Sequence, residues 1–522
     1  MKKSLFFLIG IAVLTIPAFL LVLSNENQEN TDTKISESPQ VPHSTPDPEP
    51  IELTGTPADN YSPDQRELHC GSPDAKSNEY IKEFEVPTKC TQPSSIITDS
   101  DDNVWFVQSN TGNVAKFDPL TKEFTEYEND LWNLRQEVML WGITYTDDNE
   151  IWFTDDVNDA LWKFSIHDET YSKFDFPENG FDIFPQKISV VGDDFLINDF
   201  SGNQVVLIDH KDLDEESLNY SSISIQGGLF TSQAAVDSHG NIWFVIWKFQ
   251  QEAILVKVNP NTDETEQFEL PNSINAPSGL AIGPKNNIWI PDAAGNSFYK
   301  IIPDDKHVIE FITTKPAVWT YGNFSGLIKT PISRPYWNAF DSDGNMWFNQ
   351  QTANRLAVFN PNTESLIEYD IPSKNPNWSD CGEMKDCGNS QSLGFTLSDD
   401  KVWFTEWVEN NIGVLDSSKI LPISLETQKK EIQIKQGELK EIHVTIKPQT
   451  DEKLEVLLTS NTSAESIKVE TPSESIEVLE TEIEIPVTIF AENNAQKGSY
   501  KVLIGTQLQD VVVSSYITIK II

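Results

Sequence analysis

The amino-acid sequence predicts an all-β protein: a seven-bladed β-propeller followed by an immunoglobulin-like β-sandwich, with an N-terminal transmembrane or signal segment. Three observations predict it. A hairpin motif recurs through residues 94–415, a tryptophan-free region of alternating apolar and polar residues follows, and an uncharged apolar run lies near the N-terminus. The expected parts are a signal anchor or signal peptide (1–23), a disordered linker (24–60), the propeller (61–418) and the sandwich (421–522).

The repeated motif is an acidic or Asn/Gly turn followed by an apolar residue and, in most copies, Trp-Phe. Its seven copies are centred on Trp105, Trp152, Phe195, Trp243, Trp289, Trp347 and Trp403. The steps between them are 47, 43, 48, 46, 58 and 56 residues, near the ~40–50 residues of a four-stranded propeller blade. Short apolar runs between turn signals indicate strands. One blade cannot bury its own apolar faces, so the blades are expected to stack around an axis.

The ring also needs a closing strand. Residues 80–87 (Tyr-Ile-Lys-Glu-Phe-Glu-Val-Pro) copy the fourth-strand phrase at residues 366–372. They stand before the first complete blade, so we expect them to pair with the last blade as its outer strand. This pairing would leave no open sheet edge at the seam.

The N-terminal run is the expected targeting element. Lys2 and Lys3 precede 19 uncharged residues, 5–23, which as a helix at ~1.5 Å per residue approach the ~30 Å thickness of the hydrocarbon core. No Ala-x-Ala site follows, which favours an uncleaved anchor, with a removed signal peptide as the alternative. The positive end stays inside, so the rest is expected outside the cell membrane, or secreted if the signal is cleaved. Residues 24–60 are rich in Pro, Ser, Thr and acidic residues and have the composition of a disordered tether.

Charge and cysteines limit the partners and the compartment. The formal net charge of −44 argues against a nucleic-acid partner, and solubility in a salty medium is the simpler meaning of that charge. Four cysteines fit an oxidising compartment. Proximity predicts the pairs Cys70–Cys90 and Cys381–Cys387, because the alternative, metal ligation, lacks a Cys-x2-Cys pair.

The C-terminal region, residues 421–522, contains no Trp and alternates apolar with polar residues, as in 442–446 and 516–520. That pattern is typical of half-buried antiparallel sheet. The number of short strands predicts an immunoglobulin-like sandwich, with the default role of a spacer or adhesion module.

A ring of polar residues is expected at the axial face of the propeller, three residues after each central Trp or Phe195. These positions are Gln108, Asp155, Asn198, Ile246, Asp292, Gln350 and Glu406. Asp155, Asn198, Asp292 and Glu406 offer oxygen ligands for Mg²⁺ or Ca²⁺. Solvated channel residues are the alternative.

A second ring opens the inner strands and reads Ser94, Trp141, Gln186, Ser232, Ser278, Tyr336 and Leu393, while Trp247 and Trp407 follow the polar ring. Aromatic faces beside carboxamides suit a small-molecule, glycan or peptide ligand. The candidate ligand-binding residues are Gln108, Trp141, Gln186, Tyr336, Gln350 and Trp407. Packing between blades is the alternative role of the aromatic residues.

The phrases at residues 402–413 and 151–155, with Pro-x-Gly openings such as Pro277-Ser278-Gly279-Leu280, resemble the streptogramin B lyase (virginiamycin B lyase) family over roughly residues 80–418. The resemblance implies a propeller that opens a lactone ester of a cyclic depsipeptide antibiotic by elimination, using Mg²⁺, a histidine base and a neighbouring glutamate. Glu406 matches the glutamate position. The two histidine positions hold Tyr336 and Leu393.

None of the seven histidines is expected to replace these bases: His43 and His69 precede the ring, and His167, His210, His239, His307 and His443 lie away from the axial face. We therefore expect a membrane-tethered, lyase-like propeller that binds a ligand on its axial face without the elimination chemistry of the family. Two alternatives remain. One is a C–O lyase in which Tyr336 or Glu406 has a catalytic role, and the other is a metal-dependent lactonase or hydrolase.

Overall fold

The computed structural model describes residues 53–522, except 73, 136–137, 178–182, 212, 214–217, 226–227, 250, 252 and 324–330. The described chain is all-β with a few short helices. The expected signal segment, 1–23, and most of the expected linker lie outside the described residues. Within the described part of the chain, no helix has the length and apolar character needed to cross a membrane.

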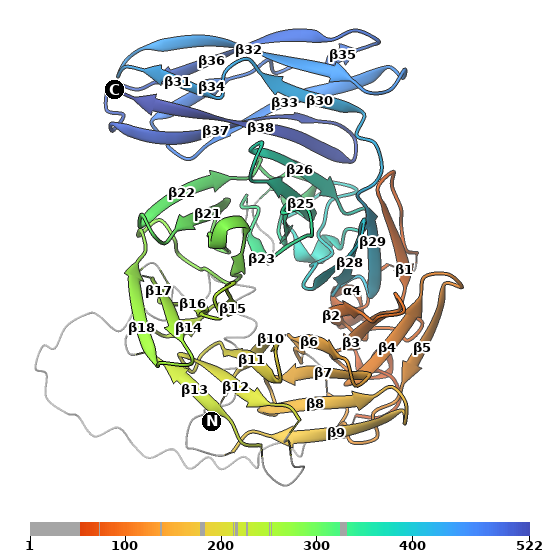
Figure 1. Cartoon of the computed structure of the whole chain (residues 1–522). Helices are drawn as coiled ribbons and strands as arrows, with labels where there is room; N and C mark the ends of the chain where they lie inside the picture. The colour runs from red at the N-terminus through yellow and green to blue at the C-terminus, as the bar shows by residue number, and fades with distance from the viewer. Residues whose placement is uncertain are drawn as a thin grey trace, which may run out of the picture.

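Antiparallel sheets surround a central axis in a propeller-like ring (Figure 1), and we number them as sheets 1 to 7 in chain order. Sheet 1 contains β2 (Pro93–Thr98), β3 (Val104–Gln108), β4 (Asn113–Asp118) and β5 (Glu123–Tyr127). Sheet 2 contains β6 (Ile143–Thr146), β7 (Glu150–Asp155), β8 (Ala160–Ser165) and β9 (Thr170–Asp175). Sheet 3 contains β10 (Pro185–Val191), β11 (Asp194–Asp199), β12 (Gln204–Asp209) and β13 (Ser221–Ser224).

The remaining sheets of the ring are built in the same way, with the first strand of each sheet nearest the axis and the last strand on the outside (Figure 1). Sheet 4 contains β14 (Phe230–Thr231), β15 (Ala235–Val236), β16 (Ile242–Trp247), β17 (Ile254–Asn259) and β18 (Glu264–Glu269). Sheet 5 contains β19 (Ala281–Ile282), β20 (Ile288–Pro291), β21 (Ser297–Ile302) and β22 (His307–Ile312). Sheet 6 contains β23 (Pro335–Phe340), β24 (Met346–Gln350), β25 (Arg355–Asn360) and β26 (Ser365–Asp370). Sheet 7 contains β27 (Phe395–Ser398), β28 (Lys401–Glu406) and β29 (Asn411–Asp416).

The outer strand of sheet 7 comes from the other end of the ring. Strand β1 (Ile81–Glu85) pairs antiparallel with β29, and Ile81 lies opposite Leu415. The expected pairing of the orphan strand phrase with the last sheet is confirmed. The expected disulfide Cys70–Cys90 is also present, and its two cysteines lie before and after β1. The second expected disulfide, Cys381–Cys387, is present in the connection between β26 and β27.

The third copy of the hairpin motif is offset by one residue from the sequence-based alignment. In sheets 1, 3 and 6 a bulge interrupts the inner strand, and the first pairs after it are Ile96–Phe106, Ile188–Ile197 and Asn338–Phe348. Leu196 therefore occupies the position of Trp105 and Trp347, and Phe195 precedes it. Because side chains alternate between faces along a strand, this shift also makes Asp199, not Asn198, the equivalent of Gln108 and Gln350.

The C-terminal region forms two sheets that face each other across an apolar core. One sheet has β30 (Ile423–Thr427), β32 (Leu439–Pro448), β36 (Ile483–Ala491) and β34 (Ile467–Glu470). The other has β31 (Glu431–Ile434), β38 (Val511–Ile521), β37 (Gly498–Gln507), β33 (Leu454–Thr462) and β35 (Ile476–Val478). Alternating burial along β36 and β33 matches the alternating sequence pattern.

The sandwich is joined directly to the ring. Strand β38 pairs antiparallel with β26, so sheet 6 continues into the C-terminal region as one nine-stranded sheet (Figure 1). Tyr516 is fully buried against Phe311 and Phe359 of sheets 5 and 6. Lys501 binds Glu364 at 2.6 Å. A loosely connected spacer would lack such a shared core, so the ring and the sandwich form one packed body.

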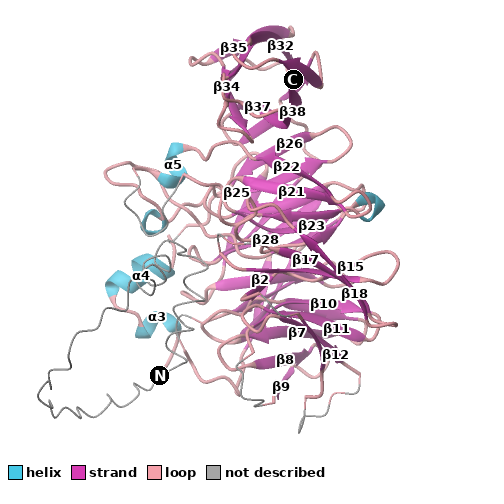
Figure 2. Ribbon diagram, turned by 90° about the vertical axis from the view of Figure 1, so that its left-hand side faces the viewer, coloured by secondary structure: helices cyan, strands magenta, loops and turns pink. Residues whose placement is uncertain are grey.

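Short helices gather on one face of the ring (Figure 2), namely α3 (Pro57–Asn60), α4 (Pro63–His69) and α5 (Val318–Tyr321). Helix α3 lies inside the range expected to be linker. Thr56 and Asp59 form a capping box there, and Pro57 at the first turn has a backbone suited to a helix start. Helix α4 contacts the single turn η2 (Pro376–Trp378) in the connection before sheet 7.

Candidate functional site

The helix-bearing face is also where the inner strands begin and the second strands end. In sheets 2, 3, 6 and 7, one side chain of the second strand accepts a backbone N–H at the start of the inner strand. The same side chain donates to a backbone carbonyl in the next sheet or just before it. Thr154 accepts from Gly142 at 2.9 Å and donates to the Gln186 carbonyl at 2.6 Å. Thr405, Asn198 and Asn349 do the same in sheets 7, 3 and 6. These contacts fix the spacing of the inner strands around the axis.

Asn198 is therefore a structural residue. Its side-chain oxygen accepts the N–H of Lys187 at 2.9 Å, and its side-chain nitrogen donates to the Thr231 carbonyl at 3.2 Å. Both ends of the amide are engaged by the backbone, which leaves it poorly placed to coordinate an ion.

The short acids of the expected polar ring cap turns. Asp155 accepts the N–H groups of Val157 and Asn158 and the indole N–H of Trp162. Asp292 accepts the N–H groups of Asn275, Ala276 and Ala294. An aspartate side chain is just long enough to reach the turn that follows its own strand.

In other sheets the same position of the second strand has a longer side chain. This side chain reaches across the third strand and contacts a glutamate on the fourth strand. Gln350 donates to Glu368 at 2.7 Å, and Gln108 donates to Glu126. In sheet 7 the corresponding contact joins Glu406 to Glu83 of β1. Gln108, Gln350 and Glu406 are all fully buried, so the expected ligand-binding residues Gln108 and Gln350 direct their side chains into their own sheets.

These contacts determine whether the four proposed ligands could hold one Mg²⁺ or Ca²⁺ ion. Asp155, Asn198, Asp292 and Glu406 each bind groups of their own sheet or of the next one, and the structure does not bring them together. Across the described residues, no three or more His, Cys, Asp and Glu side chains are grouped so that they could hold a metal ion. These four residues do not fit a shared cation, and the choice of Mg²⁺ or Ca²⁺ stays a sequence-based prediction.

The aromatic residues of the prediction lie close together, but each of them is at most 4% exposed, as expected for packing between blades. Trp141, Tyr336 and Trp407 belong to one contiguous apolar cluster that also contains Trp337 and Trp378. Trp141 is oriented by a 2.8 Å hydrogen bond from its indole N–H to Asp156. Burial raises the pKa of the Asp156 carboxyl well above its usual range, and the charge of Asp155 adds to this.

His69 also lies on this face, which the sequence analysis did not expect. Its ring lies 5.9 Å from those of Trp378 and Trp407, and its Nδ1 is 3.0 Å from the amide nitrogen of Gln92. Burial lowers the pKa of His69 to about 4. His69 precedes the ring in sequence, but helix α4 and the Cys70–Cys90 disulfide return it to the axis, and only the fold reveals this.

Lys187 is the second residue that the sequence analysis missed. It is the second bulge residue of sheet 3, where sheets 2, 5 and 7 have Gly142, Gly279 and Gly394. Its Nζ lies 4.8 Å from the ring centroid of Trp337, the corresponding bulge residue of sheet 6. Burial lowers the pKa of Lys187 to about 8. The sequence offered one signal for Lys187: three other copies of the repeat have glycine at this position.

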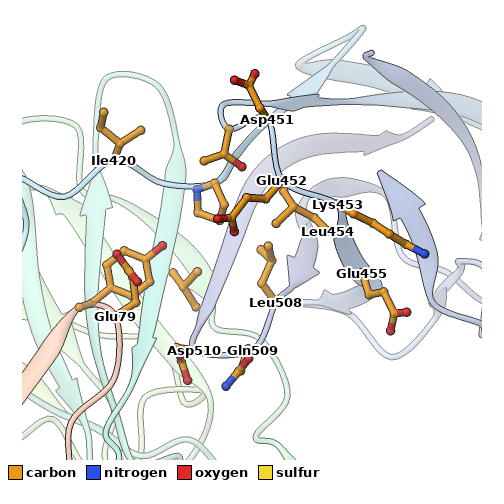
Figure 3. A pocket seen from close by; sticks show the side chains of 14 residues that line it. Glu79, Ile420, Asp451, Glu452, Lys453, Leu454, Glu455, Leu508, Gln509 and Asp510 are labelled. Carbon is orange, nitrogen blue, oxygen red and sulfur yellow. The ribbon is translucent and has the colours of Figure 1, made fainter. Parts of the chain in front are cut away.

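A separate pocket of about 1040 Å³ lies between the ring closure and the sandwich (Figure 3). Glu79, Glu452 and Asp510 stand around it, with Ile420 and Leu508 among its apolar lining. Burial and the nearby charges of Asp370 and Glu79 raise the pKa of Asp510. The pocket is acidic, and it lies outside the axial face.

With this geometry established, comparisons with known proteins identify the family. The model of the virginiamycin B lyase family matches residues 79–381, more than half of the chain. The chain belongs to the virginiamycin B lyase family. A comparison with curated proteins gave no match.

Solved structures of virginiamycin B lyase from Staphylococcus aureus share the fold. The selenomethionine protein aligns with a TM-score of 0.50 and 18% identity, over 64% of this chain and 98% of that chain. A catalytically inactive variant with quinupristin aligns with a TM-score of 0.50 and 19% identity, over 64% and 98%. At this identity the likeness supports the fold alone.

In this family member, the positions expected to carry histidine bases are both buried, since Tyr336 and Leu393 are each 1% exposed. Burial raises the pKa of Tyr336 to about 12, so its hydroxyl keeps its proton at neutral pH. Arg334 lies over the Tyr336 ring at 5.9 Å. Neither side chain offers a general base near pH 7.

Proposed function

We propose that this chain is a membrane-tethered, extracytoplasmic binding protein of the virginiamycin B lyase family. In this proposal it has a seven-bladed propeller and an immunoglobulin-like sandwich, and it binds a small-molecule, glycan or peptide ligand on the axial face without elimination chemistry. The observation that carries the proposal is the replacement of both base positions by the buried Tyr336 and Leu393. Loss of a general base typically costs ~10²–10⁴ in rate.

Quinupristin tests the absence of elimination. The full chain is incubated with it, and the products are followed by chromatography and mass spectrometry. Elimination would give a ring-opened isomer of unchanged mass, and hydrolysis would add the mass of one water. We expect neither product, and ring opening at the rate of the S. aureus lyase would contradict the proposal. The two masses also separate the alternative activities, a C–O lyase and a lactonase or hydrolase.

Binding is tested by a thermal shift of the full chain with small ligands. A ligand that binds only the folded state adds RT ln(1 + [L]/Kd) to stability, about 2.7 kcal/mol at a hundredfold excess over Kd. We expect the shift to be lost in Trp337→Ala and kept in Leu439→Ala, a change at an exposed sandwich residue. Equal shifts in both variants would place the ligand elsewhere.

The proposed compartment rests on the two disulfides, which persist outside the reducing cytosol, and on the apolar N-terminal run. Protease added to intact cells should digest the chain, and removal of residues 1–23 should release it from the membrane fraction. Protection from protease in intact cells would contradict this part of the proposal.

A further inference from the structure

Lys187 and Trp337 meet across the axis of the ring. They are equivalent bulge residues of sheets 3 and 6, which are separated by sheets 4 and 5 on one side of the ring. The ammonium group of Lys187 lies 4.8 Å from the indole centroid, within the ~6 Å range of a cation–π contact. A long side chain can reach the axis here, whereas a Cβ on the corresponding Gly142 would meet the backbone of the next sheet at 2.3 Å.

No carboxylate forms an ion pair with Lys187 in the described part of the chain. Two other lysines over tryptophan, Lys163 and Lys257, have Glu150 at 3.3 Å and Glu266 at 2.9 Å. Removal from water, with no opposite charge, lowers the pKa of Lys187 to about 8. A protein with a net charge of −44 thus has an uncompensated cation at its axis.

A second donor belongs to the residue that precedes Lys187 in the sequence. Gln186, the neighbouring bulge residue, is 1% exposed, and its side-chain nitrogen has no hydrogen-bond partner among the described residues. Buried donors of this kind are nearly always satisfied in folded proteins by protein, water or ligand. An ammonium group and an amide donor on adjacent residues suit an acceptor that carries negative charge.

We propose that the axial site selects a small organic anion, whose carboxylate binds the Lys187 ammonium beside the Trp337 ring. This inference rests on the proposed axial binding function and names its ligand class. A single lysine balances one negative charge, and the acidic protein disfavours a dianion, so a monocarboxylate is favoured over a phosphate monoester.

The test uses benzoate and its neutral isostere benzamide, titrated into the full chain by calorimetry. We expect benzoate to bind more tightly than benzamide and its affinity to fall about tenfold or more in Lys187→Met, as for loss of a charge-assisted hydrogen bond. Lys187→Arg should retain binding. Lys257→Met is the matched control, because it removes a lysine from a tryptophan face that has its own glutamate partner.

Each result decides a different point, provided that melting curves show every variant folded. Equal benzoate affinity in the wild type and Lys187→Met would overturn the inference, as would no benzoate binding by the wild type. Equal binding of benzoate and benzamide, lost in Trp337→Ala, would overturn the anion preference while supporting axial binding. A further expected signature is weaker benzoate binding as the pH rises through about 8, where Lys187 loses its proton.

Discussion

The carboxyl group of Glu406, at the end of β28, is hydrogen-bonded to the carboxyl group of Glu83 in the closing strand β1. Both side chains are buried. Glu83 accepts the backbone N–H groups of Ser373 at 2.9 Å and Lys76 at 2.8 Å, so it is the better-stabilised anion of the pair. Burial and the charge of Glu83 raise the pKa of Glu406 well above its usual range, so Glu406 takes up a proton more readily than an ordinary carboxyl group.

The pair should make the seam sensitive to alkali. A raised pKa means that the folded state holds the proton more tightly than the unfolded state, so the stabilisation is present at low pH and lost as the pH rises through the raised pKa. Glu406→Gln copies the Gln108–Glu126 and Gln350–Glu368 contacts. We expect this variant to melt at a higher temperature than the wild type at pH 8, by about 1–2 kcal/mol of stability, with a smaller gain at pH 5. Gln108→Glu is the reverse control and should lower alkaline stability.

Removal of the Cys70–Cys90 disulfide should destabilise the ring more than removal of Cys381–Cys387. The two bridges span 20 and 6 residues, which correspond to about 3 and 2 kcal/mol of loop entropy. Cys70 also directly follows His69 of helix α4. Melting of the paired Cys→Ser variants checks this order, and a larger loss in the Cys381/Cys387 variant would contradict it.

Tyr516→Ala should uncouple the sandwich from the ring. The side chain is fully buried between Phe311 and Phe359, and such truncations cost about 3–5 kcal/mol. Calorimetry should show one transition for the wild type and two for the variant. Leu439→Ala, at an exposed position of β32, is the control and should leave a single transition. One unchanged transition in Tyr516→Ala would show that the shared sheet alone couples the two parts.

His69 should make the axial face sensitive to acid. Its pKa is lowered by burial from the usual 6.5 to about 4, so its stabilising contribution is present above pH 6.5 and is lost as the pH falls toward 4. Compared with the wild type, His69→Gln should be less stable at pH 7 and should lose less stability on going to pH 5. His239→Gln removes an exposed histidine and should leave the acid response of the wild type intact.

The fold was predictable because the repeat carries it. The Trp motif, the turn residues between strands and the orphan strand phrase each have a local physical meaning, and the pairing of β1 with β29 followed from a phrase match alone. In the third copy the sequence alignment places Phe195 at the Trp position, whereas the structure places Leu196 there. Both Phe195 and Leu196 are apolar and buried, so the sequence does not distinguish the two registers, and the bulge that sets them is invisible without coordinates.

The candidate site was less predictable because a position in a ring does not fix the direction of a side chain. Asp155 and Gln108 occupy equivalent positions, yet one caps a turn and the other crosses its sheet, because their lengths differ. His69 precedes the ring in the sequence, yet it lies on the axial face beside Trp407. Lys187 carried a weak signal, and its contact with Trp337 depends on two inner strands meeting across the axis.

The closing strand has a consequence for biogenesis. Ile81 pairs with Leu415, so β1 stays without its partner until more than 300 further residues have been made, roughly 15–70 s at ~5–20 residues per second. During that interval β1 presents a free edge, the kind of edge that invites pairing with other chains. The edge of β26 is completed later in synthesis than that of β1, because its partner β38 begins only at Val511. Completion of both edges is thus a late event, and chaperone dependence during synthesis should be greatest just before the last strands appear.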